Sequence, residues 1–164
     1  MSGAARLATR SAGQLPLEQT MRSQPVLGHD EVLAAIDAIR AELIRRERTA
    51  VIAVADAHGE LIALLRMDGA PLSSIAVATS KAYTAARLRR PTALLGARLR
   101  EMGTDIAFYG DDRYTGFGGG LPIVVGDAIV GGIAVSGLSD AEDEALSAMG
   151  IAVIVSAGGG TRTP

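Results

Sequence analysis

A lysine and a threonine stand one helical turn apart in an alanine-rich segment, where they could meet a common ligand. Lys81 and Thr84 share a face of the helix expected over residues 73–90, because positions i and i+3 of a helix are neighbours. The ammonium group of Lys81 could pair with an anionic ligand or, if desolvated, act as a base. The alternative is a solvated lysine, which is the usual state of this residue type.

A glycine run follows the aromatic part of the chain and could supply backbone donors to the same ligand. The run lacks the lysine and serine or threonine of a phosphate-binding loop, and it precedes a strand rather than a helix. Successive exposed N–H groups can still bind an anion, although glycine runs are often flexible connectors. Besides Lys81 and Thr84, the residues expected to bind the ligand are Phe117, Gly118, Gly119, Gly120 and Pro122.

Arg66 is a further candidate for the ligand site, at the end of an expected strand. Its guanidinium could recognise a carboxylate through two parallel hydrogen bonds. The alternative is a surface ion pair with Asp68, which would contribute little to stability.

Acid–base chemistry would need titratable groups near the same place. All five aromatic residues lie between positions 83 and 117, which suggests that they wall a local feature. The candidate acid–base groups of an enzyme are Lys81, Tyr109, Tyr114, Asp112 and His58. His58 falls in an expected turn, where a histidine is usually just solvated. With one other histidine and no cysteine, a metal site is not expected.

Composition excludes several classes of protein. The chain has 164 residues, a formal net charge of −2 and no cysteine, and it fits one domain. It lacks the basic stripe of a nucleic-acid-binding protein and any apolar run of the ~18 residues that a membrane helix needs. Residues 1–23 lack the apolar core of a signal peptide, so we expect a cytoplasmic protein.

Periodicity predicts which elements position these residues. A helix is expected from His29, a hairpin over 49–67, helices over 73–90 and 92–102, a second hairpin over 122–136 and a last helix from Ser139. A short fifth strand is expected at 107–109 or 152–155. This order predicts an α+β domain at residues 29–157 with flexible tails at 1–28 and 158–164.

Four motifs in this order resemble one known family. They are Val54–Leu61 with Arg66–Ala70, Lys81–Ala85, Phe117–Ile123, and Gly131–Gly137 followed by Asp143. Together they are similar to the GlcG/HbpS-like domains, which also form the C-terminal part of PduO proteins. The resemblance covers roughly residues 29–157.

The resemblance implies a profilin-like fold, with helices packed on an antiparallel five-stranded sheet, and a homo-oligomer, octameric or similar. Some members of the family bind haem or corrinoids, so these are the cofactors to test, although the residues themselves predict none. We therefore expect a small-ligand-binding protein whose ligand is a small anionic metabolite or a tetrapyrrole. The alternative is a cofactor-independent isomerase or lyase that transfers protons on a small acid or cyclic metabolite.

Overall fold

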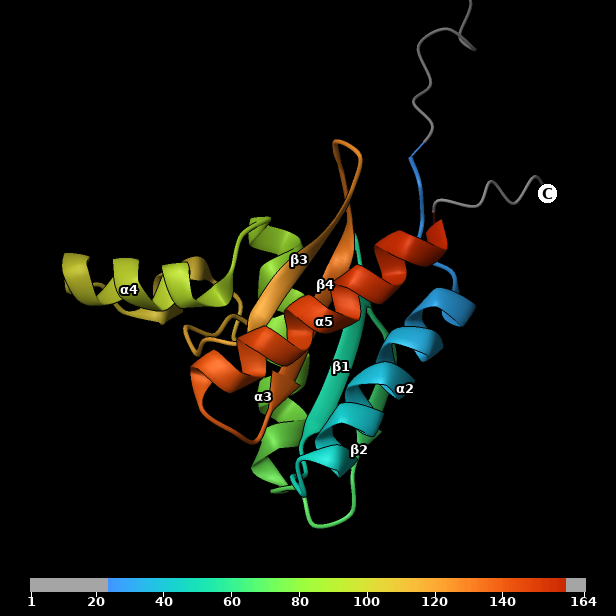
Figure 1. Ribbon diagram of the computed structural model, residues 1–164. Coiled ribbons are helices and arrows are strands. Elements are labelled where there is room, and N and C mark those ends of the chain that lie inside the picture. Colours follow the sequence, from blue (N-terminus) through green and yellow to red (C-terminus); the bar gives the residue numbers. More distant parts are fainter. Residues whose placement is uncertain (1–23, 159–164) are drawn as a thin grey trace, which may run out of the picture.

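A four-stranded antiparallel sheet with the order β2-β1-β4-β3 forms the centre of the molecule (Figure 1). The computed structural model describes residues 24–158. The elements are α2 (His29–Arg45), β1 (Val51–Asp56), β2 (Leu61–Arg66), α3 (Ser73–Leu88), α4 (Thr92–Met102), the 3-10 helix η1 (Ile106–Tyr109), β3 (Gly120–Val125), β4 (Ala128–Ser136) and α5 (Asp140–Gly158).

The α+β class is confirmed, but the expected fifth strand is wrong for the part of the chain that is described. Both regions proposed for it are helical: residues 107–109 lie in η1, and residues 152–155 lie in α5. The side chain of Asp105 accepts the N–H of Ala107 and so begins the 3-10 turn. The apolar run 151–155 resembles a strand in isolation, because periodicity cannot separate a short buried strand from the end of a buried helix.

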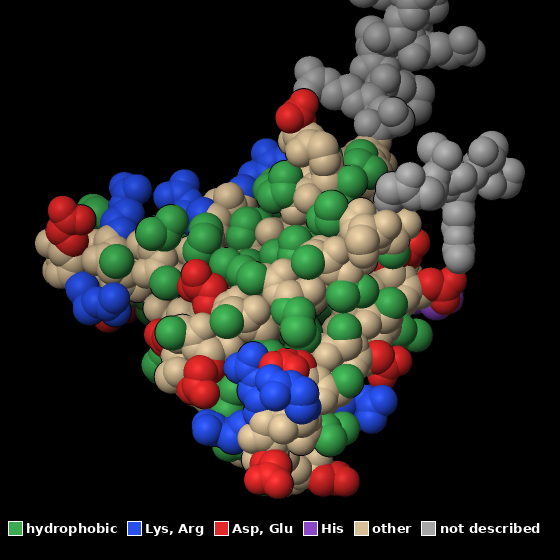
Figure 2. Space-filling model, viewed as in Figure 1, with side chains coloured by type: hydrophobic (Ala, Val, Ile, Leu, Met, Phe, Trp, Pro, Cys, Tyr) green, Lys and Arg blue, Asp and Glu red, His purple; other side chains and the backbone are tan. Residues whose placement is uncertain are grey.

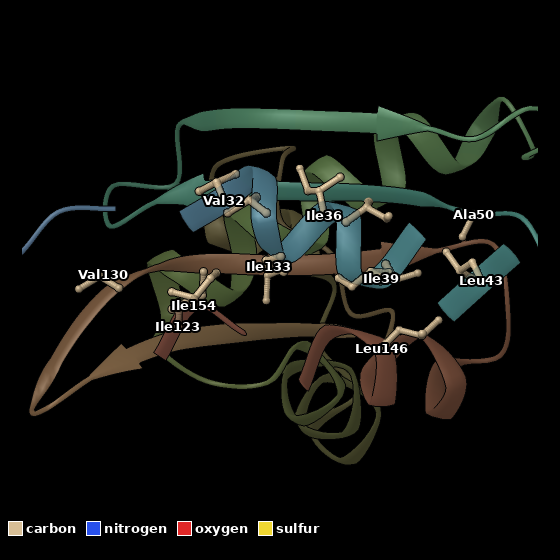
Figure 3. Close-up of a cluster of buried hydrophobic side chains, with 14 residues drawn as sticks. Val32, Ile36, Ile39, Leu43, Ala50, Ile123, Val130, Ile133, Leu146 and Ile154 are labelled. Carbon is tan, nitrogen blue, oxygen red and sulfur yellow. The ribbon is translucent and has the colours of Figure 1, made fainter. Parts of the chain in front are cut away.

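Helices cover both faces of the sheet, and the two cores differ in composition. Large aliphatic side chains of α2, α5, β1 and β4 fill one core, among them Ile36, Ile39, Ile133 and Leu146 (Figure 3). Small side chains fill the other core, beneath α3, where Ala78 and Ala82 face alanines and valine of β1 and β4. The alanine core lets the backbone of α3 approach the sheet closely.

The paired glycines within β4, Gly131 and Gly132, mark a close approach of backbones. A Cβ atom at Gly132 would collide with the carbonyl oxygen of Ala82 and lie 2.9 Å from the backbone nitrogen of Ala86. A Cβ atom at Gly131 would collide with the carbonyl oxygen of Ala55. Glycine is therefore required where β4 passes under α3 and beside β1.

Turns and caps follow local sequence chemistry. Gly59 (φ +90°) and Gly126 (φ +59°) take the left-handed conformation in the two hairpin turns. Ser139 and Glu142 form a capping box at the start of α5, with the Glu142 N–H 3.4 Å from the Ser139 hydroxyl. Among residues 24–158, no helix is long and apolar enough to cross a bilayer.

Helix α4 stands apart from the layers. Pro91 separates it from α3, and only Thr92, Leu95 and Gly96 of its residues are buried. In Figure 1 it extends away from the body of the molecule. This arrangement places α4 and the segment that follows it beside the glycine run.

Candidate functional site

Lys81 lies at the base of the glycine run in a buried ion pair. Its Nζ donates to Oδ2 of Asp143 at 2.9 Å and to the carbonyl oxygen of Val135 at 3.1 Å. Both side chains of the pair are 2% exposed. Burial raises the pKa of the Asp143 carboxyl, while the hydrogen bond and charge of Lys81 act to lower it. A ligand would reach Lys81 only by displacing Asp143, so the role of Lys81 toward a ligand stays a prediction.

The glycine run packs on this ion pair, and two of its backbone donors already have partners. The Gly118 N–H donates to Asp140 Oδ2 at 3.0 Å, and the Gly120 N–H donates to the Thr92 hydroxyl at 3.0 Å. Gly119 has φ +108°, and a Cβ atom there would lie 2.9 Å from Lys81 Nζ. The run is thus a fitted connection between α4, α5 and β3, and Gly120 opens β3 two residues before the half-buried Pro122.

Thr84 fastens the preceding segment to α3. Its hydroxyl, which is buried, accepts the N–H of Thr115 at 3.0 Å. Phe117, two residues later, has a side chain that is 61% exposed. Thr84 therefore holds residues 114–117 in place from behind.

Arg66 does not join these residues. It ends β2, which is one edge of the sheet, whereas the glycine run leads into β3, the other edge. Arg66 lines a separate hollow with Arg40 and Met67. Sequence alone could not show this, because the order of strands in the sheet comes from tertiary pairing.

Three of the aromatic residues form a cluster with an acidic and a basic partner. The Tyr83 hydroxyl donates to Asp111 Oδ2 at 2.5 Å, and the Arg113 guanidinium lies 4.1 Å from the centre of the Tyr83 ring. The Tyr114 ring is 5.3 Å from that of Tyr83 and 5.1 Å from that of Tyr109. The cluster pins the segment between η1 and β3 onto the C-terminal half of α3.

Electrostatics favour one ionisation state of this cluster. Burial and the hydrogen bond with Asp111 raise the pKa of Tyr83 to about 12. Hydrogen bonds from Arg113 and Tyr83 hold the pKa of Asp111 well below its ordinary value. A neutral tyrosine and an ionised aspartate are therefore both favoured near neutral pH.

The remaining acid–base candidates lie around the rim of the cluster. Asp112 is exposed beside Asp111. The side chain of His58 is 79% exposed in the turn between β1 and β2, and its carbonyl oxygen accepts from Arg87 at 3.4 Å. The structure brings Tyr109 and Tyr114 into contact, while Lys81 lies buried in its ion pair with Asp143. Whether any of the five acts as an acid or base stays a prediction.

A hollow of about 380 Å³ opens between α4 and residues 114–117, and we call it the α4 pocket. Its walls are largely apolar, and one guanidinium contributes a positive charge. The lining residues are Gly96, Leu99, Arg100, Ile106, Tyr114, Thr115, Gly116 and Phe117. Such a combination of apolar walls and a few polar groups is typical of small-ligand sites.

Two glycines hold α4 against the opposite wall of the pocket. A Cβ atom at Gly96 would collide with the carbonyl oxygen of Gly116, and a Cβ atom at Gly116 would lie 2.9 Å from Gly96 Cα. Sequence reasoning missed Gly96, Leu99, Arg100 and Ile106. The signal that could have found them is Gly96, because glycine inside a helix costs about 1 kcal/mol relative to alanine and so points to a packing reason.

The pocket offers one cation to a ligand and no metal site. Among residues 24–158, Arg100 makes no ion pair, and its Nη1 lies 3.3 Å from the Cβ position of Gly96. Groups of three or more histidines and carboxylates placed for a metal do not occur in the same range. Arg100 is thus available to pair with a carboxylate at the pocket.

Known proteins share both the sequence pattern and the fold of this chain. The family model described as "Haem degrading protein HbpS-like" matches residues 27–152. Protein GlcG of Escherichia coli strain K12 is 34% identical over 116 residues, which cover 71% of this chain and 85% of that protein. An uncharacterized 15.0 kDa protein of the dhaT-dhaS intergenic region of Citrobacter freundii is 30% identical over 115 residues, covering 67% and 79% of the two chains.

Solved structures extend the similarity to three dimensions. A double mutant of Streptomyces reticuli HbpS superposes with a TM-score of 0.73 and 28% identity, covering 93% of this chain and 98% of that chain. A PduOC:heme complex superposes with a TM-score of 0.72, covering 79% and 95% of the two chains. Its 24% identity supports a common fold.

Proposed function

This chain belongs to the HbpS-like family, and from that premise we propose that it binds a small ligand in the α4 pocket. The ligand we infer is a flat, largely apolar molecule that carries a carboxylate. The observation that supports this is the pairing of apolar walls from Leu99, Ile106 and Phe117 with the unpaired guanidinium of Arg100. Both a small anionic metabolite and a tetrapyrrole with its propionates have this chemistry.

Haem is the tetrapyrrole bound in the PduOC complex. The α4 pocket suits the porphyrin ring and its carboxylates better than the iron. Axial ligands to haem iron are usually histidine, cysteine, methionine or tyrosine. Among the pocket residues only Tyr114 has such a group, and its side chain is engaged in a hydrogen bond with Arg87. His58 lies in the β1–β2 turn, and His29 begins α2. We therefore propose that a tetrapyrrole would be recognised by shape and carboxylate charge, without ligation of the iron by one chain.

A titration with two porphyrins tests the proposal. Haemin and metal-free protoporphyrin IX are each added to the protein, and binding is followed by absorbance and by porphyrin fluorescence anisotropy. We expect the two porphyrins to bind with similar dissociation constants, and Arg100→Gln to weaken both. Arg90→Gln, which removes an exposed arginine outside the pocket, is the matched control and should leave both constants unchanged.

Three outcomes separate the alternatives. Tight haemin binding without protoporphyrin binding would show that the iron is ligated and would contradict recognition by shape. Equal binding to wild type and Arg100→Gln would place the ligand outside the α4 pocket. Failure of both porphyrins, with stabilisation by small aromatic carboxylates in a thermal-shift assay, would select the small anionic metabolite.

The buried ion pair bears on the choice between binding and catalysis. Lys81 is engaged by Asp143 and the Val135 carbonyl, so the most basic of the candidate groups has no open access to a substrate. This favours binding over an isomerase or lyase. A homo-oligomer and a cytoplasmic location stay predictions from the sequence.

A further inference from the structure

The α4 pocket has two walls of different kinds. Helix α4 forms one wall, and basic side chains gather over this helix in Figure 2, Arg98 and Arg100 among them. The other wall belongs to residues 110–117, which we call the strap, and residues 114–117 of the strap line the pocket. The strap contains no helix or strand. Its shape therefore depends on its contacts with the rest of the molecule.

The carboxylate of Asp111 gives the strap its local shape. Its Oδ1 accepts the backbone N–H of Arg113 at 3.0 Å and the Nε of the same residue at 3.1 Å. The backbone carbonyl of Asp111 accepts the N–H of Tyr114 at 3.3 Å. These bonds close a turn over residues 111–114, because an aspartate side chain can bond to the backbone two residues further on. The turn delivers Tyr114 to the pocket.

The same carboxylate fastens the strap to α3. Oδ2 of Asp111 accepts the Tyr83 hydroxyl at 2.5 Å and the Nη2 of Arg113 at 3.0 Å. Tyr83 is 2% exposed, and its ring packs against that of Tyr114, so the strap is held by a side chain that is itself fixed in the interior. Each oxygen of Asp111 thus accepts two hydrogen bonds.

The remaining tethers of the strap are weaker. Arg87 and Thr84 each make one hydrogen bond to it. Arg113 reaches Glu60 at 3.3 Å, but these side chains are 51% and 69% exposed, and such surface pairs contribute little. Hydrogen bonds to an ionised group are roughly twice as strong as those between neutral groups. Asp111 is therefore the strongest single tether of the strap.

We propose that Asp111, which does not line the α4 pocket, is a positioning residue that sets the affinity of the pocket for its ligand. It acts through Tyr114 and the residues that follow, which it holds in place opposite α4. A binding site loses affinity when its supporting residues let the contacting groups shift by about 1 Å. The inference rests on the proposed binding function and adds to it a residue that the ligand does not touch.

A substitution of one atom tests the inference. Asp111→Asn keeps the shape of the side chain but turns one acceptor oxygen into an NH2 group, which would face donors. The matched control is Asp112→Asn, because the Asp112 carboxylate makes no hydrogen bond or ion pair within residues 24–158. Protoporphyrin IX binding, followed by fluorescence anisotropy, should weaken about tenfold in Asp111→Asn. It should stay unchanged in Asp112→Asn.

A double-variant cycle separates positioning from a general loss of structure. Tyr83→Phe removes the other partner of the short hydrogen bond and should also weaken porphyrin binding. In the double variant Tyr83→Phe/Asp111→Asn, the loss of affinity should be smaller than the product of the two single losses, because both changes break the same bond. Circular dichroism checks that each variant is folded.

Hydrogen exchange followed by mass spectrometry reads the strap without any ligand. Peptides that cover residues 110–117 should exchange faster in Asp111→Asn than in wild type. Peptides from α2 and β4 should exchange at the wild-type rate, which would show that the strap alone has loosened.

The outcomes distinguish this inference from the proposed function. Wild-type affinity in Asp111→Asn, whatever its exchange rate, would overturn the inference and leave ligand binding intact. Equal weakening by Asp112→Asn would overturn it too, because net charge would then be the cause. If wild type binds no porphyrin, the same comparison is made with 1-naphthoate. A wild type that binds neither probe would overturn the binding function, and this inference with it.

Discussion

At the scale of single residues, the buried pair of Lys81 and Asp143 has a direct bearing on stability. Taking two charges out of water is costly, and their attraction offsets this only while both are present. Asp143 also accepts the N–H of Leu138 at 3.2 Å, so the pair joins α3 to the start of α5. Removing one charge leaves the other uncompensated in the interior.

Lys81→Met should therefore lower the free energy of unfolding by about 3–5 kcal/mol. The double variant Lys81→Met/Asp143→Leu should recover much of that loss, because neither charge remains buried. Denaturant unfolding followed by circular dichroism measures both. Wild-type stability of the single variant would mean that the pair is not closed to water.

Tyr83 gives the molecule a specific sensitivity to alkali. Its pKa rises from 10.0 to about 12 in the folded state, so the neutral hydroxyl is favoured on folding. This contribution to stability is complete below pH 10 and is lost as the pH rises toward 12. Wild type should lose stability between these values more steeply than Tyr83→Phe, which has no proton to lose there. Parallel slopes for the two proteins in urea unfolding would contradict the assigned shift.

At the scale of the element, the α4 pocket depends on how closely α4 can lie against residues 114–117. Alanine in place of glycine normally stabilises a helix interior by about 1 kcal/mol. At Gly96 the added methyl group would collide with the backbone carbonyl of Gly116. A backbone carbonyl cannot move aside by a change of rotamer, as a side chain can.

Gly96→Ala should thus destabilise the protein, whereas a glycine-to-alanine change inside a helix usually stabilises it. The variant should also bind the porphyrin probe more weakly. Ala97→Gly, at the next and exposed position, is the matched control. It should lose helix stability by about 1 kcal/mol but leave the affinity unchanged. An unchanged affinity in Gly96→Ala would show that the width of the pocket is not set by this contact.

The helices and strands were largely predictable, because nearby residues determine where each of them begins and ends. Glycines in the two hairpin turns, Pro91 between helices and the capping box at Ser139 all act within a few residues. The run 151–155 was wrongly predicted as a possible strand. Its residue types favour a strand, but it forms the end of the helix that begins at Asp140.

The site was harder to predict, because its contacts join distant parts of the chain. Asp143, the partner of Lys81, lies 62 positions further along the chain. Gly116, which packs against Gly96, belongs to the segment after η1. A pattern within α3 could show that Lys81 and Thr84 share a helix but not that one is sealed by α5. The confinement of the aromatic residues to 83–117 did indicate a local feature, and the structure brings three of them into contact.

At the scale of the whole molecule, the helix layers on the two faces of the sheet differ in how easily they accommodate an added methyl group. Beneath α3, the backbone of Gly132 faces the backbone of Ala82 and Ala86. On the other face, a Cβ atom at Gly150 of α5 would lie 2.7 Å from the Cδ1 of Ile133 and 2.8 Å from that of Ile39. Those are ends of flexible side chains, which can change rotamer.

The same substitution should therefore cost more under α3 than under α5. Gly132→Ala should destabilise by about 1–3 kcal/mol, as overpacking of a tight interior does. Gly150→Ala should cost clearly less, because the gain in helix propensity offsets the repacking. Thermal unfolding of the two variants side by side makes the comparison, and equal losses would show that both layers adapt equally.

The order of strands in the sheet has a consequence for the life of the nascent chain. Strand β1 pairs with β2 just beyond it and with β4, whose Ser136 lies opposite Val51. While the chain emerges from the ribosome, β1 keeps one unpaired edge until β4 has been synthesised, and α2 waits for α5 before its core is complete. Loop closure over such a span slows folding, so the open edge of the first hairpin can associate with other chains until β4 is available. A strand that lies inside the finished sheet is therefore an exposed edge strand in the newborn chain.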